Sequence, residues 1–201
     1  MGKETEIKFH LTPEQYRIHT DLFSRNPRHV QTLEMETTYY DTPSGSLSAR
    51  HWTLRRRMEG GSCVCTVKTP LGDHCRGEWE CQCDDILAAI SELCKLGAPA
   101  ELAVLAREGL IPICGARFTR QALKAQDEDT VVELALDQGV LTGGGREEPF
   151  QELEFELKSG CEARMRAMAA AHAARMGLWE EPRSKFARAL SLAKEGSHGQ
   201  L

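Results

Sequence analysis

Three ionisable residues occupy alternate positions near the start of the chain: Glu4, Glu6 and Lys8. In a β-strand, alternate side chains point the same way, about 6.6 Å apart along the strand. Two carboxylates at that spacing repel each other unless positive charge lies between them. The group is therefore either an ordinary solvated strand face or part of a site that holds cations, and one stretch alone does not decide.

The same pattern recurs in other segments with strand character. Arg55 and Arg57 share a face, with Arg56 on the other. Further pairs that share a face are Thr66 and Lys68, Glu78 and Glu80, Arg120 and Lys124, Glu133 and Asp137, and the last strand adds Glu152, Glu154, Glu156 and Lys158. A sheet with one side in water also alternates polar and apolar residues. Such a sheet does not explain the crowded carboxylates, because their like charges repel each other. If the sheet closes with these faces inside, the carboxylates could hold divalent cations and the basic side chains a polyanion.

Composition bounds the function classes. The chain has 201 residues, 41% hydrophobic and 27% charged, with a net charge of −5. These values predict a single globular domain over residues 1–201. They disfavour a nucleic-acid partner, because no global basic footprint is present. No apolar stretch has the length of a membrane span, so no membrane partner is expected and a cytoplasmic location is the default expectation.

The elements that must position these residues follow from periodicity and capping. The patterns predict strands at 4–9, 32–41, 52–58, 63–70, 77–83, 118–126, 130–139 and 150–160, and helices at 13–24, 84–97, 99–109, 161–177 and 182–196. Thr12, Pro13 and Gln15 form a capping-box signature. Gly60 and Gly61 mark a hairpin turn.

Eight cysteines raise the question of disulfides or zinc. Without a signal segment, free thiols are the simpler expectation. Cys63 and Cys65, like Cys81 and Cys83, form C-x-C pairs rather than the C-x-x-C pairs of structural zinc sites. The two thiols of each pair share a strand face, where they serve as small apolar residues.

Acidic and basic groups that together hold metal and polyanion are typical of phosphoryl-transfer sites, because Mg²⁺ takes carboxylate and phosphate oxygens while Arg binds phosphate bidentately. The chain has no G-x-x-x-x-G-K-[ST] loop, which excludes a P-loop enzyme. Its motifs resemble those of the CYTH superfamily, the triphosphate tunnel metalloenzymes, and most of all the bacterial inorganic triphosphatases. The matching segments are ExExK (4–8), YYDTP (39–43), LRRR (54–57), TVKTP (66–70), RGEWE (76–80), FTR (118–120), VELALDQG (132–139), ELEFELKSG (152–160) and SKFAR (184–188).

The resemblance implies an α+β fold: a closed antiparallel eight-stranded β-barrel, or tunnel, with helices packed outside. It implies a metal site for Mg²⁺ or Mn²⁺ made by Glu4, Glu6, Glu152, Glu154 and Glu156. It implies that phosphate is bound by Lys8, Arg55, Arg57, Lys68, Arg120 and Lys185, with Glu4, Glu6, Lys8, Lys68 and Lys185 as catalytic residues. The tunnel acids Glu78, Glu133 and Asp137 have less definite roles. The chain departs from the family at Ala122, where relatives often carry a basic residue, and Lys124 is the expected substitute.

The expected activity is metal-dependent hydrolysis of inorganic triphosphate, or of another polyphosphate, to pyrophosphate and phosphate. Two alternatives remain open at this point. One is an enzyme for an organic triphosphate, such as a thiamine triphosphatase, a nucleoside triphosphatase or an adenylate cyclase. The other is a polyphosphate-binding module without catalysis. The sequence gives no indication of the oligomeric state.

Overall fold

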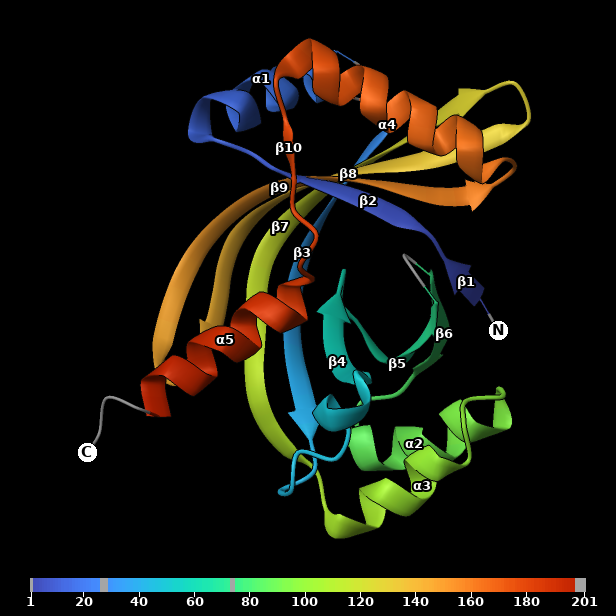
Figure 1. The fold of residues 1–201 in the computed structure, drawn as a ribbon, viewed down its shortest axis with the longest axis vertical. Coiled ribbons are helices and arrows are strands. Elements are labelled where there is room, and N and C mark those ends of the chain that lie inside the picture. The colour runs from blue at the N-terminus through green and yellow to red at the C-terminus, as the bar shows by residue number, and fades with distance from the viewer. Residues whose placement is uncertain (1, 26–28, 73–74, 198–201) are drawn as a thin grey trace.

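The computed structural model describes residues 2–25, 29–72 and 75–197 (Figure 1). In chain order the elements are β1 (Gly2–Glu4), β2 (Glu6–His10), α1 (Pro13–Ser24), β3 (Val30–Asp41), the 3-10 helix η1 (Ser48–Arg50), β4 (Thr53–Glu59), β5 (Ser62–Gly72), β6 (Cys75–Gln82), α2 (Ile86–Lys95), α3 (Glu101–Leu105), η2 (Ala106–Glu108), β7 (Ile111–Asp127), β8 (Thr130–Gly143), β9 (Arg146–Ser159), α4 (Glu162–Met176), β10 (Trp179–Glu180) and α5 (Lys185–Ser197). None of the helices in these residues is long and apolar enough to span a bilayer.

The strands form one antiparallel sheet of ten, in the order β1-β6-β5-β4-β3-β7-β8-β9-β2-β10. The predicted closed eight-stranded barrel is therefore wrong, because the end strands β1 and β10 do not pair with each other in the described residues. The first predicted strand is divided at Thr5. Its first part pairs with β6 and its second part pairs with β9, so the N-terminal segment reaches both sides of the sheet without forming one continuous ladder.

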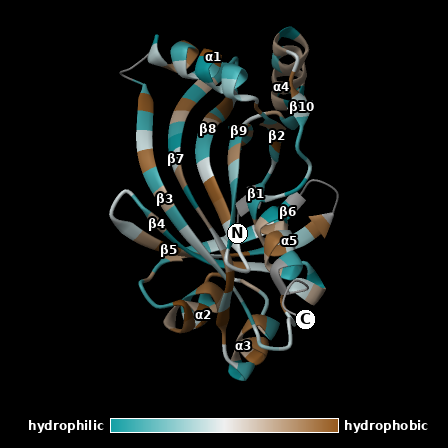
Figure 2. Cartoon of the chain, turned by 90° about the vertical axis from the view of Figure 1, so that its left-hand side faces the viewer, coloured by the Kyte–Doolittle hydropathy of each residue, from teal (hydrophilic) through white to brown (hydrophobic). Residues whose placement is uncertain are grey.

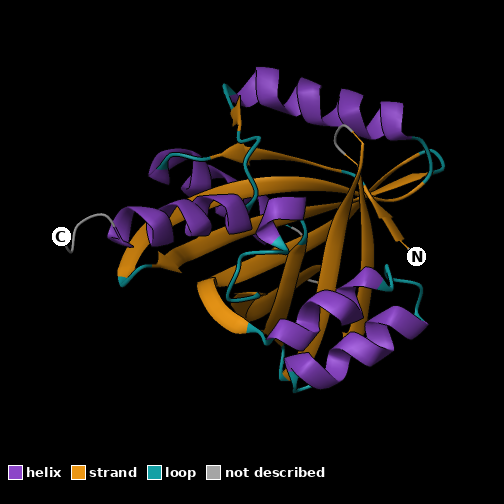
Figure 3. Cartoon of the chain, turned by 60° about the horizontal axis from the view of Figure 1, so that its bottom comes forward, coloured by secondary structure: helices purple, strands orange, loops and turns teal. Residues whose placement is uncertain are grey.

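Helices cover the sheet in three places (Figures 1 and 3). Helices α1 and α4 cover an apolar cluster that includes Phe9, Leu136 and Phe155, and α2 and α3 cover another built around Leu54, Val67 and Trp79. Strand residues alternate between hydrophobic and hydrophilic along these segments, as the banding in Figure 2 shows.

Helix α5 is the exception to the expected arrangement of helices packed outside the sheet. It packs on β7, β8 and β9 through Ala189 and Leu192, against a cluster that contains Met35 and Phe118. Met35 and Phe118 also line the main cavity, so α5 lies on the cavity side. The sequence pattern of an amphipathic helix shows that one face is buried but not which side of a sheet receives it.

The start of α1 confirms the predicted capping box. Thr12 Oγ1 accepts the backbone N–H of Gln15 at 3.2 Å, and the Gln15 side chain accepts the backbone N–H of Thr12 at 2.9 Å. The Gln15 side-chain amide also donates to the carbonyl of Gly177 at 3.1 Å. One residue therefore both caps α1 and holds it to the end of α4.

Two histidines complete the contact between α1 and α4. His19, which is 1% exposed, donates from Nδ1 to the Gln15 carbonyl at 2.6 Å, because a carbonyl oxygen only accepts. Its Nε2 is then the acceptor for Nε2–H of His172 at 2.9 Å, and His172 Nδ1 accepts from Arg175 at 3.1 Å. This chain of hydrogen bonds requires both imidazoles to be neutral.

We expect the histidine pair to make the protein less stable in mild acid. Burial and the neighbouring His19 lower the pKa of His172 to about 4, and burial also lowers the pKa of His19. The unfolded chain therefore binds protons first, and stability falls as the pH decreases from about 6.5 toward 4. Thermal melting of wild type and His172→Gln across this range should show a shallower loss in the variant. The exposed His29→Gln is the control, and equal slopes for all three proteins would contradict the assignment.

Candidate functional site

A cavity of about 1110 Å³ lies on the concave side of the sheet. Most of the predicted site residues line it: Glu4, Glu6, Lys8, Arg55, Arg57, Lys68, Glu78, Arg120, Glu133, Glu154, Glu156 and Lys185. This agrees with the strand parity deduced from the sequence. Three predicted residues are not part of the lining among the described residues: Lys124, Asp137 and Glu152.

Two arginines on β4 contribute positive charge to the cavity. Arg55 is 3.7 Å from Glu78, beyond hydrogen-bond range, and Arg57 contacts Glu59 at 2.6 Å. Within the described residues, the buried Nε of each arginine has no hydrogen-bond partner. Burial and the neighbouring Arg55 lower the pKa of Arg57 to about 10. Unused donors in a region of excess positive charge are what an anion would complete.

Next to the arginines, Lys68 of β5 contacts carboxylates on β1 and β6, the two strands at one end of the strand order. Its Nζ lies 2.5 Å from Glu4 on β1 and 3.3 Å from Glu78 on β6. Burial alone would raise the pKa of Glu78, but Lys68 and Arg55 hold it below its usual value. Lys68 thus neutralises carboxylates that would otherwise repel each other.

Strands β2 and β9 bring carboxylates face to face. Glu6 lies directly opposite Glu156, and Lys8 lies opposite Glu154. Lys8 Nζ contacts Glu6 at 3.0 Å, and Lys158 contacts Glu156 at 2.8 Å. Burial raises the pKa of Glu156 in spite of Lys158, so the carboxylate is only partly compensated. This pair of opposed glutamates is open to the cavity.

A buried ion network of three acids and three bases forms part of the cavity wall and extends behind it: Asp137, Glu152, Glu154, Arg120, Lys185 and Arg188. Arg120 holds Asp137 through two hydrogen bonds of 2.8 and 2.7 Å and reaches Glu154 at 2.6 Å. Lys185 from α5 contacts all three acids, and Arg188 contacts Glu152 at 3.1 Å. Burial alone would raise the pKa of Glu154, but Lys185 and Arg120 hold it well below its usual range.

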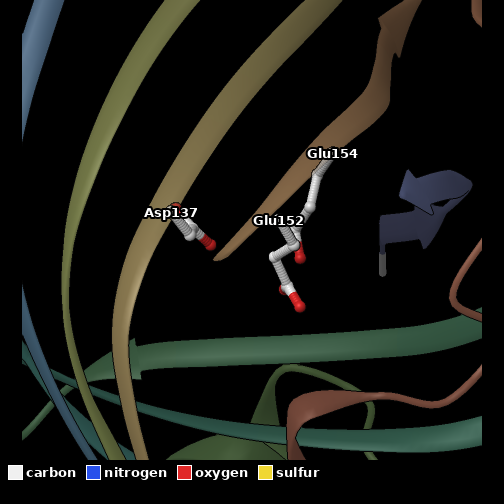
Figure 4. Close-up of side chains that lie close together, drawn as sticks. All are labelled: Asp137, Glu152 and Glu154. Carbon is white, nitrogen blue, oxygen red and sulfur yellow. The ribbon is translucent and has the colours of Figure 1, made fainter. Parts of the chain in front are cut away.

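The three acids of this network are also the carboxylates that come closest together in the described residues (Figure 4). One oxygen from each lies within 4.8 Å of the others, close enough to share a metal ion. However, three basic side chains already contact them, and Asp137 and Glu152 are 0% exposed. Outside this network, the carboxylates that face the cavity and could supply oxygen ligands to a hard divalent cation include Glu4, Glu6 and Glu156.

Sequence reasoning gave no site role to three further residues. Lys158, which the sequence places on the charged face of the last strand, lines the cavity, as does Arg183, and Arg188 joins the buried ion network. Arg188 lies three residues after Lys185, so the helical spacing placed both on one face of α5. The proposed substitute Lys124 is exposed and does not reach the cavity, whereas Ala122 lines it.

Comparison with known proteins identifies the family. The family model of the CYTH domain matches residues 2–190. The chain belongs to the CYTH domain family. An inorganic triphosphatase of Haemophilus influenzae is 29% identical over 170 residues, which are 80% of this chain and 46% of that protein. The chain therefore spans about half the length of this curated relative.

Comparison with solved structures supports the fold. A candidate adenylyl cyclase from Hippeastrum, found to have a dominant triphosphatase activity, aligns with a TM-score of 0.65 and 20% identity, covering 98% of this chain and 96% of its own. A candidate adenylate cyclase from Bacillus halodurans aligns with a TM-score of 0.61 and 18% identity, covering 92% and 96%. At these identities the likeness concerns the fold alone.

Adjacent arginines on β4 give a matched test of the cavity. Arg57 lines the cavity, whereas Arg56 faces outward and donates to the Asp84 carbonyl at 2.9 Å. We expect Arg57→Ala to weaken binding of inorganic triphosphate by about 1–3 kcal/mol, the cost of a lost charged hydrogen bond. Arg56→Ala should bind like wild type. Calorimetric titration of both variants checks this, and equal losses would show that the strand face is misassigned.

Proposed function

We propose that this protein hydrolyses inorganic triphosphate to pyrophosphate and phosphate in the cavity, with Mg²⁺ or Mn²⁺ as cofactor. The observation that carries the proposal is the division of charge across the cavity. Arginines with unused donors lie on β4, and opposed glutamates lie on β2 and β9. A ligand that brings both anionic oxygens and bound metal would complete both halves at once.

The size and lining of the cavity support a small, highly charged substrate. It is lined by many ionised side chains and few aromatic ones, Tyr39 and Phe118 with Phe186 from α5. Tyr39 and Phe118 belong to a buried cluster against α5. Little aromatic surface is thus free to stack a thiamine ring or a nucleobase. This favours inorganic triphosphate over the organic alternatives.

Glu4, Glu6, Glu154 and Glu156 would hold the metal through carboxylate oxygens. When bound, the metal neutralises phosphate charge and acts as a Lewis acid on phosphoryl oxygens. The residues of the chain then have separate tasks. Arg55 and Arg57 bind phosphate oxygens with donors that are unused in the described structure, and Lys8 and Lys68 exchange part of their contact with Glu6 and Glu4 for substrate oxygens.

Hydrolysis requires a water molecule to attack a terminal phosphorus while its bond to the bridging oxygen breaks. The departing pyrophosphate gains negative charge on that oxygen, so fixed cations near it lower the barrier. Lys68, Arg120 and Lys185 line the cavity and are candidates for this task. A cavity carboxylate orients the water, and its proton passes to the products. Glu78, Glu133 and Asp137 then serve to position the basic side chains.

Loss of one opposed glutamate should weaken the binding of the metal ion. Glu6→Gln keeps the shape of the side chain but removes one charged ligand from the Glu6–Glu156 pair. We expect the metal concentration for half-maximal activity to rise roughly tenfold or more, by analogy with groups that support metal ligands. Phosphate release from inorganic triphosphate, ATP, thiamine triphosphate and long polyphosphate, with each metal and after chelation, measures both metal and substrate preference.

The control for this substitution is Glu14→Gln, which makes the same charge change on the exposed side of α1. An unchanged metal dependence in Glu6→Gln would refute the metal assignment. Faster turnover of ATP or thiamine triphosphate than of inorganic triphosphate would refute the substrate assignment. Binding without phosphate release from any of the four compounds would support a non-catalytic module instead.

Substrate and metal together should stabilise the fold. Both bind only the folded cavity, so ligand at about 100 times its Kd adds roughly 2.7 kcal/mol to the free energy of unfolding. For a domain of this size, that raises the melting temperature by about 5–10 °C. Triphosphate without metal should give a smaller rise, because the glutamates stay uncompensated. Equal melting temperatures with triphosphate plus Mg²⁺ and with sulfate plus Mg²⁺ would rule out a triphosphate site.

A further inference from the structure

Four cysteines form a compact group on the face of β5 and β6 that points away from the cavity. On these strands the even-numbered residues, such as Lys68 and Glu78, line the cavity. The odd-numbered Cys63 and Cys65 of β5, and Cys81 of β6 with Cys83 just beyond it, therefore lie on the opposite face, beside α2. All four are free thiols.

The strand register places these cysteines in two opposed pairs. Cys65 lies directly opposite Cys81, and Val64 lies opposite Gln82. The next step of the ladder brings Cys63 opposite Cys83, whose backbone N–H donates to the Cys63 carbonyl at 3.1 Å. Opposed residues of antiparallel strands have Cα atoms about 4.5 or 5.5 Å apart, which lies within the range of about 4.4–6.8 Å that a disulfide spans.

The two pairs differ in reactivity. Cys65 is 0% exposed, and burial raises the pKa of its thiol to about 12, which makes it inert. Cys83 is partly exposed and can meet a reagent in solution. Its partner Cys63 lies within interaction range of the Arg56 guanidinium.

A shared metal ion explains the group less well than a disulfide. A tetrahedral zinc site needs several sulfurs converging on one point. Among the described residues, the one group of three or more candidate ligands that converges is the acidic trio of the buried ion network, and no cysteine belongs to it. The cysteines are thus arranged as pairs rather than as a cage.

We propose that Cys63 and Cys83 form a reversible disulfide with each other across the two strands. The oxidant is a low-molecular-weight disulfide such as glutathione disulfide. The Cys83 thiolate attacks one sulfur of the oxidant, breaks its S–S bond and releases one thiol. The Cys63 thiolate then attacks Cys83 Sγ in the mixed disulfide and releases the second thiol. Two protein thiols lose two electrons and two protons, which reduce the oxidant to two thiols.

The test is incubation of the reduced full-length protein with glutathione disulfide, followed by intact-mass measurement and non-reducing peptide mapping. Wild type should lose about 2 Da, with Cys63 joined to Cys83, and dithiothreitol should reverse the change. Cys63→Ser should instead accumulate the glutathione adduct on Cys83. Cys161→Ser, which removes an exposed thiol elsewhere, should form the cross-link like wild type.

Arg56→Gln gives a second measurement that does not remove a cysteine. It should keep the cross-link but let the glutathione adduct of Cys83 persist several times longer, because the cation beside the resolving thiol is removed. A stable adduct in wild type, a Cys65–Cys81 cross-link in its place, or no reaction at Cys83 would each overturn the proposal. The wild-type peptide map shows whether Cys63 and Cys83 are joined, and this result does not depend on the folding of any cysteine variant.

Discussion

The buried ion network is the interaction on which the rest of the site depends. Asp137 and Glu152 are removed from water completely, which would be prohibitive without bases in direct contact. Two of the three bases, Lys185 and Arg188, come from α5, and the third comes from β7. The need to neutralise these acids therefore fixes α5 on the cavity side, where it forms part of the cavity wall.

The charged side chains of the ion network contact one another directly, whereas those of the open cavity keep capacity for a ligand. Lys185 and Arg120 contact the three acids, Lys68 is shared between two glutamates, and Arg57 has a buried Nε without a partner among the described residues. The donors on β4 can accept anionic oxygens as partners, and the opposed glutamates of β2 and β9 can accept a cation. A ligand is drawn to this region, while the ion network beside it holds the walls in place.

The sequence predicted which faces of the strands carry charge, because a period of two is a local property. It therefore predicted Arg57 inside and Arg56 outside, and most of the predicted site residues line the cavity. It could not predict how the strands join at the ends of the sheet, because the break at Thr5 depends on two distant partners, β6 and β9. The contact between His19 and His172, 153 residues apart, was likewise invisible to spacing rules.

A glycine helps to seat the lysine of the network. Gly139 lies opposite Phe118 on one side and Phe150 on the other, and a Cβ built on it would come within 2.5 Å of the Phe118 backbone and side chain. Because Gly139 has no Cβ, the rings of Phe118 and Phe150 can approach to a centroid distance of 5.7 Å. Lys185 Nζ lies 5.1 Å from the Phe118 centroid and 5.4 Å from that of Phe150. Both rings make cation–π contacts with the ammonium group. Gly139 therefore helps to position Lys185, the base that contacts all three acids of the network.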